Sequence, residues 1–353
     1  MTMGTGDAPY LAREVVTRVI NANVQAMLDE FPIYNLFTST SGGEPQMLPG
    51  EVALLDIDYQ ERRAADNHTQ PGRADRFLHT RTGQILVRVL YHQVKDAIRP
   101  NELAQLREPG MSGDMSPAAA QVLAKINRIV ERGTRTILRA REIDCANMLS
   151  SATYTRTVDG VSNTVTTGLT LLGSGTISAS WSTASTDIIG DMGKMLETHT
   201  DQAGEAPTVC AMSFLQAANI AKNDKVRALL NGNGALQAGD LSIGGVVSAV
   251  FASLGAPGVQ VITHMSHYKN SSGTKTYYWA SDRMALVSGQ GAQDVLGFIT
   301  CPQILPDGTL SASSIFPHQW VEDETGEHWI KVQGVGAPYL GDVSKITLYD
   351  LTP

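Results

Sequence analysis

Hydrophobic and polar positions follow the most regular pattern between Ser116 and Leu149, where two stripes recur at helical spacing. The apolar stripe has spacings of four, three and four residues, and a basic stripe has the same spacings offset by two. Because each helical residue turns about 100°, this offset places the stripes roughly 200° apart. The pattern predicts one long helix with an apolar and a cationic side, made by Ile126, Val130, Gly133, Ile137 and by Arg128, Arg132, Arg135, Arg139.

The ends and the middle of this helix carry further signals. Ser116 suits an N-cap, and Pro117 suits the first helical position. Gly133 lies in the middle, where glycine costs about 1 kcal/mol relative to alanine. We therefore expect either a bend at Gly133 or the close approach of a neighbouring element.

The N-terminal third predicts two arms. Pro9 to Met27 has the spacing of an amphipathic helix, which fits a core helix or an arm docked on a neighbouring subunit. Residues 31–45 look like a loop, and 51–60 and 84–94 look like strands. Between those strands, residues 61–81 are polar and carry charges of both signs. This predicts a long hairpin arm, with a surface loop as the alternative.

The rest of the chain mixes helices and strands without regular βαβ alternation, which predicts an α+β fold. Asp159-Gly160 marks a hairpin turn. We expect helices at 97–106, 188–199, 214–221 and 225–230, the second capped by the Ser185–Asp187 stretch and the third by Ser213. We expect strands at 208–212, 258–263, 274–280, 284–287, 295–299, 328–333 and 345–351.

Composition narrows the class of protein. With 353 residues and 42% hydrophobic residues, the chain can bury a large core. Its net charge of -8 argues against generic nucleic-acid binding by the whole surface. The three cysteines are far apart, which fits a reducing compartment. We expect neither a signal peptide nor a membrane span, and no association with a membrane.

Catalytic and cofactor motifs do not stand out, so we expect no enzyme activity and no cofactor. The sequence contains no phosphate-binding loop, GxSxG elbow or HExxH pair. His264 and His267 stand in a polar stretch that we expect to be exposed rather than metal-binding. Cys145 is expected to be a small apolar filler of the long helix.

Two sets of charged residues are candidates for contacts. Asp56 and Asp58 share one face of the strand at 51–60, and salt bridges to the arm's arginines are the expected role; the arginines are Arg62, Arg63, Arg73 and Arg76. The arginine stripe of the long helix has three open interpretations: a solvated face, pairing with acids of neighbouring subunits, or contact with nucleic-acid phosphates.

In this order, the parts resemble the major capsid protein of tailed bacteriophages, in particular its lambda-like branch. The stretch from Trp181 to Leu230 is similar to the family's sequence of a Trp, an Asp-capped helix, a P-x-V-x-x-M strand and a helix. Pro207, Val209 and Met212 supply that strand motif. The end, VQGVGAPYLGDVSKITLYDL, is similar to the family's closing strands.

The resemblance implies five segments: an N-terminal arm (1–40), an extended hairpin arm (41–95), a peripheral domain with the spine helix (96–193), an axial domain (194–317) and C-terminal strands that return to the peripheral domain (318–353). It implies an icosahedral shell of hexamers and pentamers enclosing double-stranded DNA. The implied partners are other copies, portal and scaffold proteins and a decorating protein, and the implied location is the virion, after synthesis in the host bacterial cytoplasm.

Three alternatives stay open from the sequence. An encapsulin-like compartment resembles the same fold but encloses a protein cargo. An enzyme with an unfamiliar site would stay monomeric. Another phage structural part, such as a tail or decorating protein, would form rings or tubes.

Overall fold

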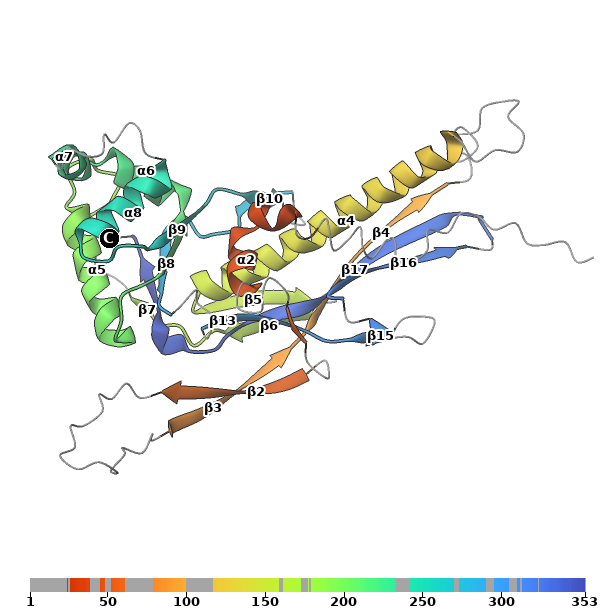
Figure 1. Ribbon diagram of the computed structural model, residues 1–353, viewed down its shortest axis with the longest axis horizontal. Helices are drawn as coiled ribbons and strands as arrows, with labels where there is room; N and C mark the ends of the chain where they lie inside the picture. Colours follow the sequence, from red (N-terminus) through yellow and green to blue (C-terminus); the bar gives the residue numbers. More distant parts are fainter. Residues whose placement is uncertain are drawn as a thin grey trace, which may run out of the picture.

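The computed structural model of the chain is elongated, with one long helix running beside a sheet along much of its length (Figure 1). It describes residues 24, 26–38, 45–47, 52–60, 79–99, 117–158, 161–172, 177, 179–232, 242–269, 273–289, 295–304, 310–311, 313–322 and 324–352. The long helix is α4, Pro117–Ser150, with 34 residues. The prediction of a single long helix is therefore confirmed.

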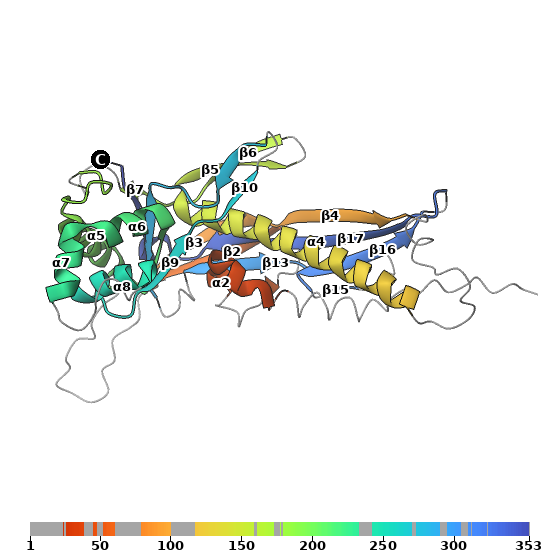
Figure 2. The same ribbon diagram turned by 90° about the horizontal axis from the view of Figure 1, so that it is seen from above.

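The sheet beside α4 is organised around β17, His328–Leu340. Its first part lies between β4 (Leu90–Ile98) and β16 (Ile315–Val321), and both pair with it antiparallel. Its last part pairs with β13 (Leu296–Thr300), which in turn pairs with the short β1 (Gln46–Met47). Figures 1 and 2 both show α4 running along β4 and β17.

Helix α4 packs on this sheet through its apolar stripe. Ile126, Val130 and Ile137 are buried, as are Ile330 and Val332 of β17. A Cβ added to Gly133 would lie 2.8 Å from Cγ2 of Val332, which no real contact tolerates. The expected close approach at Gly133 is thus confirmed, because β17 occupies the space that a side chain would need.

A second lobe contains the sheet β7-β18-β12-β8-β9 and four helices (Figure 2). Its strands are β7 (Leu171–Leu172), β18 (Ile346–Asp350), β12 (Arg283–Val287), β8 (Val209–Ser213) and β9 (Gln260–His264). Its helices are α5 (Ile188–Ala203), α6 (Phe214–Lys222), α7 (Asp224–Gly232) and α8 (Ile243–Ser253). They bury a core that includes Trp181, Met192, Val247 and Phe251.

Among the described strands, four hairpins lie outside these two sheets. They are β2–β3 (Val52–Gln60 and His79–Arg88), β5–β6 (Thr153–Val158 and Val161–Thr166), β10–β11 (His267–Lys269 and Lys275–Tyr277) and β14–β15 (Gln303–Ile304 and Leu310–Ser311). The β2–β3 hairpin extends away from the body in Figure 1. Two single-turn 3-10 helices complete the described elements, η1 (Leu28–Glu30) and η4 (Val343–Lys345).

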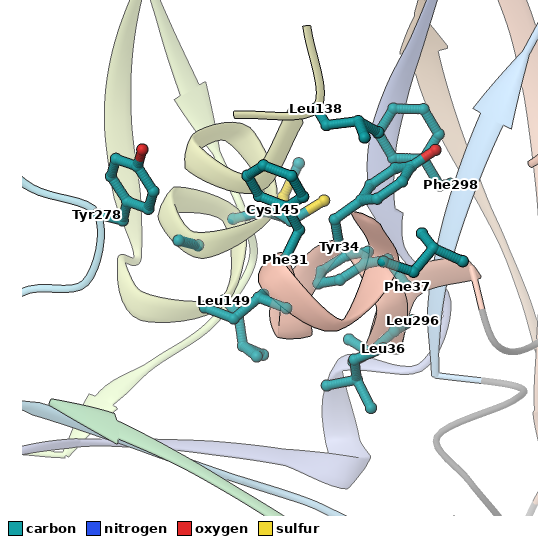
Figure 3. Close-up of a cluster of buried hydrophobic side chains, with 14 of the residues drawn as sticks. Phe31, Tyr34, Leu36, Phe37, Leu138, Cys145, Leu149, Tyr278, Leu296 and Phe298 are labelled. Carbon is teal, nitrogen blue, oxygen red and sulfur yellow. The ribbon is translucent and has the colours of Figure 1, made fainter. Parts of the chain in front are cut away.

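The short helix α2, Pro32–Thr38, joins the core between α4 and β13. Figure 3 shows Phe31, Tyr34 and Phe37 beside Leu138 of α4 and Phe298 of β13. The interpretation of 31–45 as a loop is therefore wrong for 32–38. With seven residues, α2 is too short to be stable alone, so its stability comes from packing against residues far away in sequence.

Most predicted elements are present, and several bounds differ. The strands at 51–60, 208–212, 284–287 and 345–351 match β2, β8, β12 and β18 within one residue at each end, and the strand predicted at 328–333 is the first half of β17. The hairpin around Asp159-Gly160 is β5–β6, although those two residues lie outside the described part. The helices at 188–199, 214–221 and 225–230 are α5, α6 and α7.

Three predictions need correction. The strand expected at 84–94 is two strands, because the chain turns at buried Val89 from the β2–β3 hairpin into the central sheet. The helix expected at 97–106 is wrong at its start, since residues 97–98 end β4 and pair with β17. No helix is predicted at 243–253, yet these residues form α8, whose valines are buried and give no polar face to mark a helix.

Candidate functional site

The polar side of α4 carries the predicted arginine stripe. Arg128, Arg132 and Arg139 are exposed and Arg135 is half-buried, whereas the apolar stripe is buried. The predicted two-sided helix is confirmed. What the arginines contact outside the chain stays a prediction.

Two members of the stripe have partners within the chain. Arg135 Nη2 lies 3.2 Å from Glu30 Oε1, and its Nη1 lies 3.7 Å from Glu131 Oε1. The Arg139 guanidinium lies near the Tyr278 hydroxyl, just after β11, where burial raises the pKa of Tyr278 and the Arg139 charge opposes that rise. Within the described part of the chain, the side chains of Arg128 and Arg132 show no such partner. The unneutralised charge is therefore at the N-terminal half of the stripe.

Arg141 lies two residues beyond the arginine stripe and, unlike the stripe, is fully buried. It donates to Tyr34 Oη at 2.8 Å, to the Ser314 carbonyl at 2.6 Å and to the Val335 carbonyl at 3.0 Å. Its guanidinium also lies over the ring of Phe298, 5.1 Å from the centroid. Burial raises the pKa of Tyr34, against the opposing effect of the Arg141 charge. The Tyr34 hydroxyl thus stays neutral and accepts this bond.

Glu142, the next residue, is also fully buried. Its carboxylate accepts from the backbone N–H groups of Ile33 at 3.1 Å and Tyr34 at 2.6 Å, in the first turn of α2. His264 Nε2, at the end of β9, lies 2.7 Å from Glu142 Oε1. An acid at a helix N-terminus satisfies N–H groups that have no partner inside the helix. Glu142 therefore joins α2, α4 and β9.

The position of His264 corrects the sequence interpretation. We expected both histidines of this stretch to be exposed. His267 is exposed, but His264 is only 6% exposed and is bound to Glu142.

One feature of the sequence could have revealed the buried charge of Arg141. Arg141 follows Ile137 by four residues, so it continues the apolar stripe onto the buried side of the helix.

A third buried polar group lies in the second lobe. His199 of α5 makes hydrogen bonds through both ring nitrogens, Nδ1 with Thr347 Oγ1 at 2.7 Å and Nε2 with Ser288 Oγ at 2.5 Å. Burial lowers the pKa of His199 to about 4. The imidazole is therefore neutral at pH 7 and ties α5 to β18.

The hairpin-arm candidates are only partly within the described residues. Asp56 and Asp58 are in β2, with their backbones opposite Gln84 and Thr82 of β3. Their side chains, and the arm arginines Arg62, Arg63, Arg73 and Arg76, lie outside the described residues. The predicted salt bridges between them stay a prediction.

The three cysteines, Cys145, Cys210 and Cys301, are buried and form no disulfide, and Cys145 fills space in α4 as expected. Among the described residues, no cluster of three or more His, Cys, Asp or Glu side chains could hold a metal ion. Within that same part of the chain, no helix combines the length and apolarity needed to cross a bilayer.

The architecture matches solved structures over nearly its whole length. A protein from E. coli CFT073 described as a prophage capsid protein superposes with a TM-score of 0.63 at 16% identity, covering 97% of this chain and 99% of the other. A phage-related protein from Bordetella bronchiseptica RB50 gives 0.55 at 11% identity, covering 94% and 96%. These likenesses establish the tailed-phage capsid fold. No curated protein sequence matches the chain.

The chain is a phage capsid subunit, because the sequence profile of a phage capsid family matches most of its length. It belongs to the family of phage major capsid protein E, whose sequence profile matches residues 25–334. Its role is therefore structural: it forms the capsid shell of the virion. The resemblance inferred from the sequence is confirmed.

Proposed function

We propose that copies of this chain assemble as hexamers and pentamers into a closed icosahedral shell around double-stranded phage DNA. The observation that carries the proposal is the elongated body, in which one 34-residue helix braces a sheet and a hairpin extends outward. A closed shell repeats the same contacts between many copies. A rigid body with an extending arm suits such contacts.

The segments take the roles that the family resemblance implies. We assign residues 1–40 and 41–95 to the N-terminal and hairpin arms and 96–193 to the peripheral domain. Within these arms, α2 and β4 pack on the body of this chain, and β2–β3 is the part that reaches a neighbouring subunit. Residues 194–317 are the axial domain, and 318–353 return to the peripheral domain. The antiparallel β2–β3 pair supports the arm, because among the described strands these two pair only with each other. Portal, scaffold and decorating proteins are the expected partners, and synthesis takes place in the host bacterial cytoplasm.

The arm proposal is tested by replacing residues 61–78 with a two-residue turn between β2 and β3. We expect a folded subunit that does not form shells, because its contact with the neighbour is lost. Far-ultraviolet circular dichroism checks folding, and sedimentation velocity checks assembly. Normal shells from this variant would contradict the role of the arm.

The contents of purified particles test the enclosed cargo. Particles from infected or induced cells are treated with nuclease, opened and analysed for nucleic acid and for protein. We expect nuclease-protected double-stranded DNA. A dominant second protein with no DNA would instead support an encapsulin-like compartment.

A further inference from the structure

The β10–β11 hairpin presents an exposed polar and aromatic face. Side chains two residues apart on a strand share a face, so His267 and Lys269 lie on the same side as Lys275 and Tyr277, which face them across the hairpin. All four are exposed. The opposite face carries Tyr268, which packs against the main core. The hairpin is thus anchored on one face and open on the other.

The open face holds two lysines whose charges repel each other, although the Lys275 ammonium also lies 4.8 Å from the centroid of the Tyr277 ring. Lys269 and Lys275 are direct cross-strand partners, and like charges in that arrangement destabilise a sheet. The sequence has no acidic residue between Asp240 and Asp282 to offset them. Two lysines held opposite each other without a local acid form a site of positive potential that an anion would relieve.

The arginine stripe of α4 contains a second pair of like charges. Arg128 and Arg132 are four residues apart, where like charges on a helix repel. Both are exposed and, among the described residues, show no acidic partner. The Arg139 guanidinium, farther along the stripe, lies near the Tyr278 hydroxyl at the base of the hairpin. The hairpin therefore lies on the arginine side of α4, and Figure 2 shows β10 beside its C-terminal half.

We propose that Arg128, Arg132, Lys269 and Lys275 form one cationic face that holds the phosphate backbone of double-stranded nucleic acid. The inference rests on the proposed function, and it deepens it by naming the surface that faces the enclosed DNA. Phosphate contact requires cations without acidic partners and does not depend on the base sequence. Within the described residues, these four side chains meet that requirement, although the net charge of the whole chain is -8.

The face differs from the neutralised part of the same helix. Arg135 lies between Arg132 and Arg139, but Glu30 and Glu131 already balance it. We therefore assign the phosphate contacts to Arg128, Arg132, Lys269 and Lys275 and leave Arg135 as an internal tie between η1 and α4. Of the four arginines in the stripe, the assignment therefore gives phosphate contacts to two.

The test measures binding of the full-length chain to a fluorescent 20-base-pair DNA duplex over a range of salt concentrations, by anisotropy. Each phosphate contact contributes about 0.9 to the slope of log K against log salt. We expect K269Q/K275Q and R128Q/R132Q each to reduce the magnitude of that slope by roughly 2. The matched control K194Q/K222Q removes two exposed lysines of α5 and α6 and should leave the slope unchanged.

The outcomes separate this inference from shell formation. Unchanged slopes in both variants overturn the cationic face, even if the wild-type chain forms shells. Unchanged slopes combined with loss of shells in sedimentation would instead assign the face to contact with a second copy. If the control variant K194Q/K222Q reduced the salt slope equally, the binding would reflect only general charge attraction, and that result also overturns the assignment. Failure of the wild-type chain to form shells would contradict the proposed function independently of these slopes.

Discussion

Glu142 and His264 form a buried pair, with 2.7 Å between Oε1 and Nε2, although 122 residues separate them in sequence. The carboxylate also accepts from two N–H groups at the start of α2. One side chain thus joins the N-terminal segment, the spine helix and the sheet of the second lobe. In a shell subunit, this connection fixes how the two lobes sit on the helix.

Replacing Glu142 by alanine should strongly destabilise the subunit. The change leaves two N–H groups and the imidazole without their acceptor, and removing one partner of a buried pair costs about 3–5 kcal/mol. Urea unfolding of unassembled protein measures the free energy of unfolding. E197Q on the exposed side of α5 is the control and should change it by less than about 0.5 kcal/mol. Equal stability of E142A and wild type would contradict the role of the pair.

Tyr34→Phe tests the bond between α2 and the buried Arg141. The substitution removes only the hydroxyl, which accepts from Nη1 at 2.8 Å. A hydrogen bond to a charged group contributes about 1.5–3 kcal/mol, so we expect a loss of that size in urea unfolding. Y349F is the matched control in the other lobe, where the hydroxyl donates to the Met195 carbonyl. The loss in Y34F should exceed that in Y349F, and the reverse order would argue against the Arg141 contact.

Gly133→Ala should destabilise the subunit despite the better helix propensity of alanine. The propensity gain is about 1 kcal/mol, but the new methyl group would meet Val332. Overpacking of a tight contact costs about 1–3 kcal/mol. The second substitution V332A should recover part of the loss, and thermal unfolding of single and double variants measures this. A more stable G133A would show that β17 is farther from α4 than described.

His199 predicts how stability depends on pH. Its pKa is about 4 in the folded chain and about 6.5 when unfolded. Between these values the unfolded chain binds more protons, so the stabilisation is complete above pH 6.5 and is lost as the pH falls toward 4. The shift corresponds to about 3 kcal/mol. H199Q should lose less stability than wild type between pH 7 and pH 4.5; an equal loss in both would contradict the neutral buried imidazole.

Helices and strands with a periodic pattern of apolar residues could be predicted from the sequence. Elements that are stabilised by contacts with distant residues could not. The stripes of α4 and the alternation of β2 and β18 are local, so their elements were found. Helix α2 depends on Glu142, more than a hundred residues away, and α8 is buried too evenly to show helical periodicity. Likewise, the arginine stripe was visible, but its division into the paired Arg135 and the exposed Arg128 and Arg132 depends on Glu30 and on the tertiary fold.

Electron microscopy of particles formed by the purified full-length chain tests the central claim most directly. We predict closed shells with icosahedral symmetry, in whose reconstruction α4 and the central sheet fit as one rigid unit in every subunit. Sedimentation at high protein concentration gives the matching mass. A chain that stays monomeric at high concentration, or that forms only rings or tubes, would contradict the account.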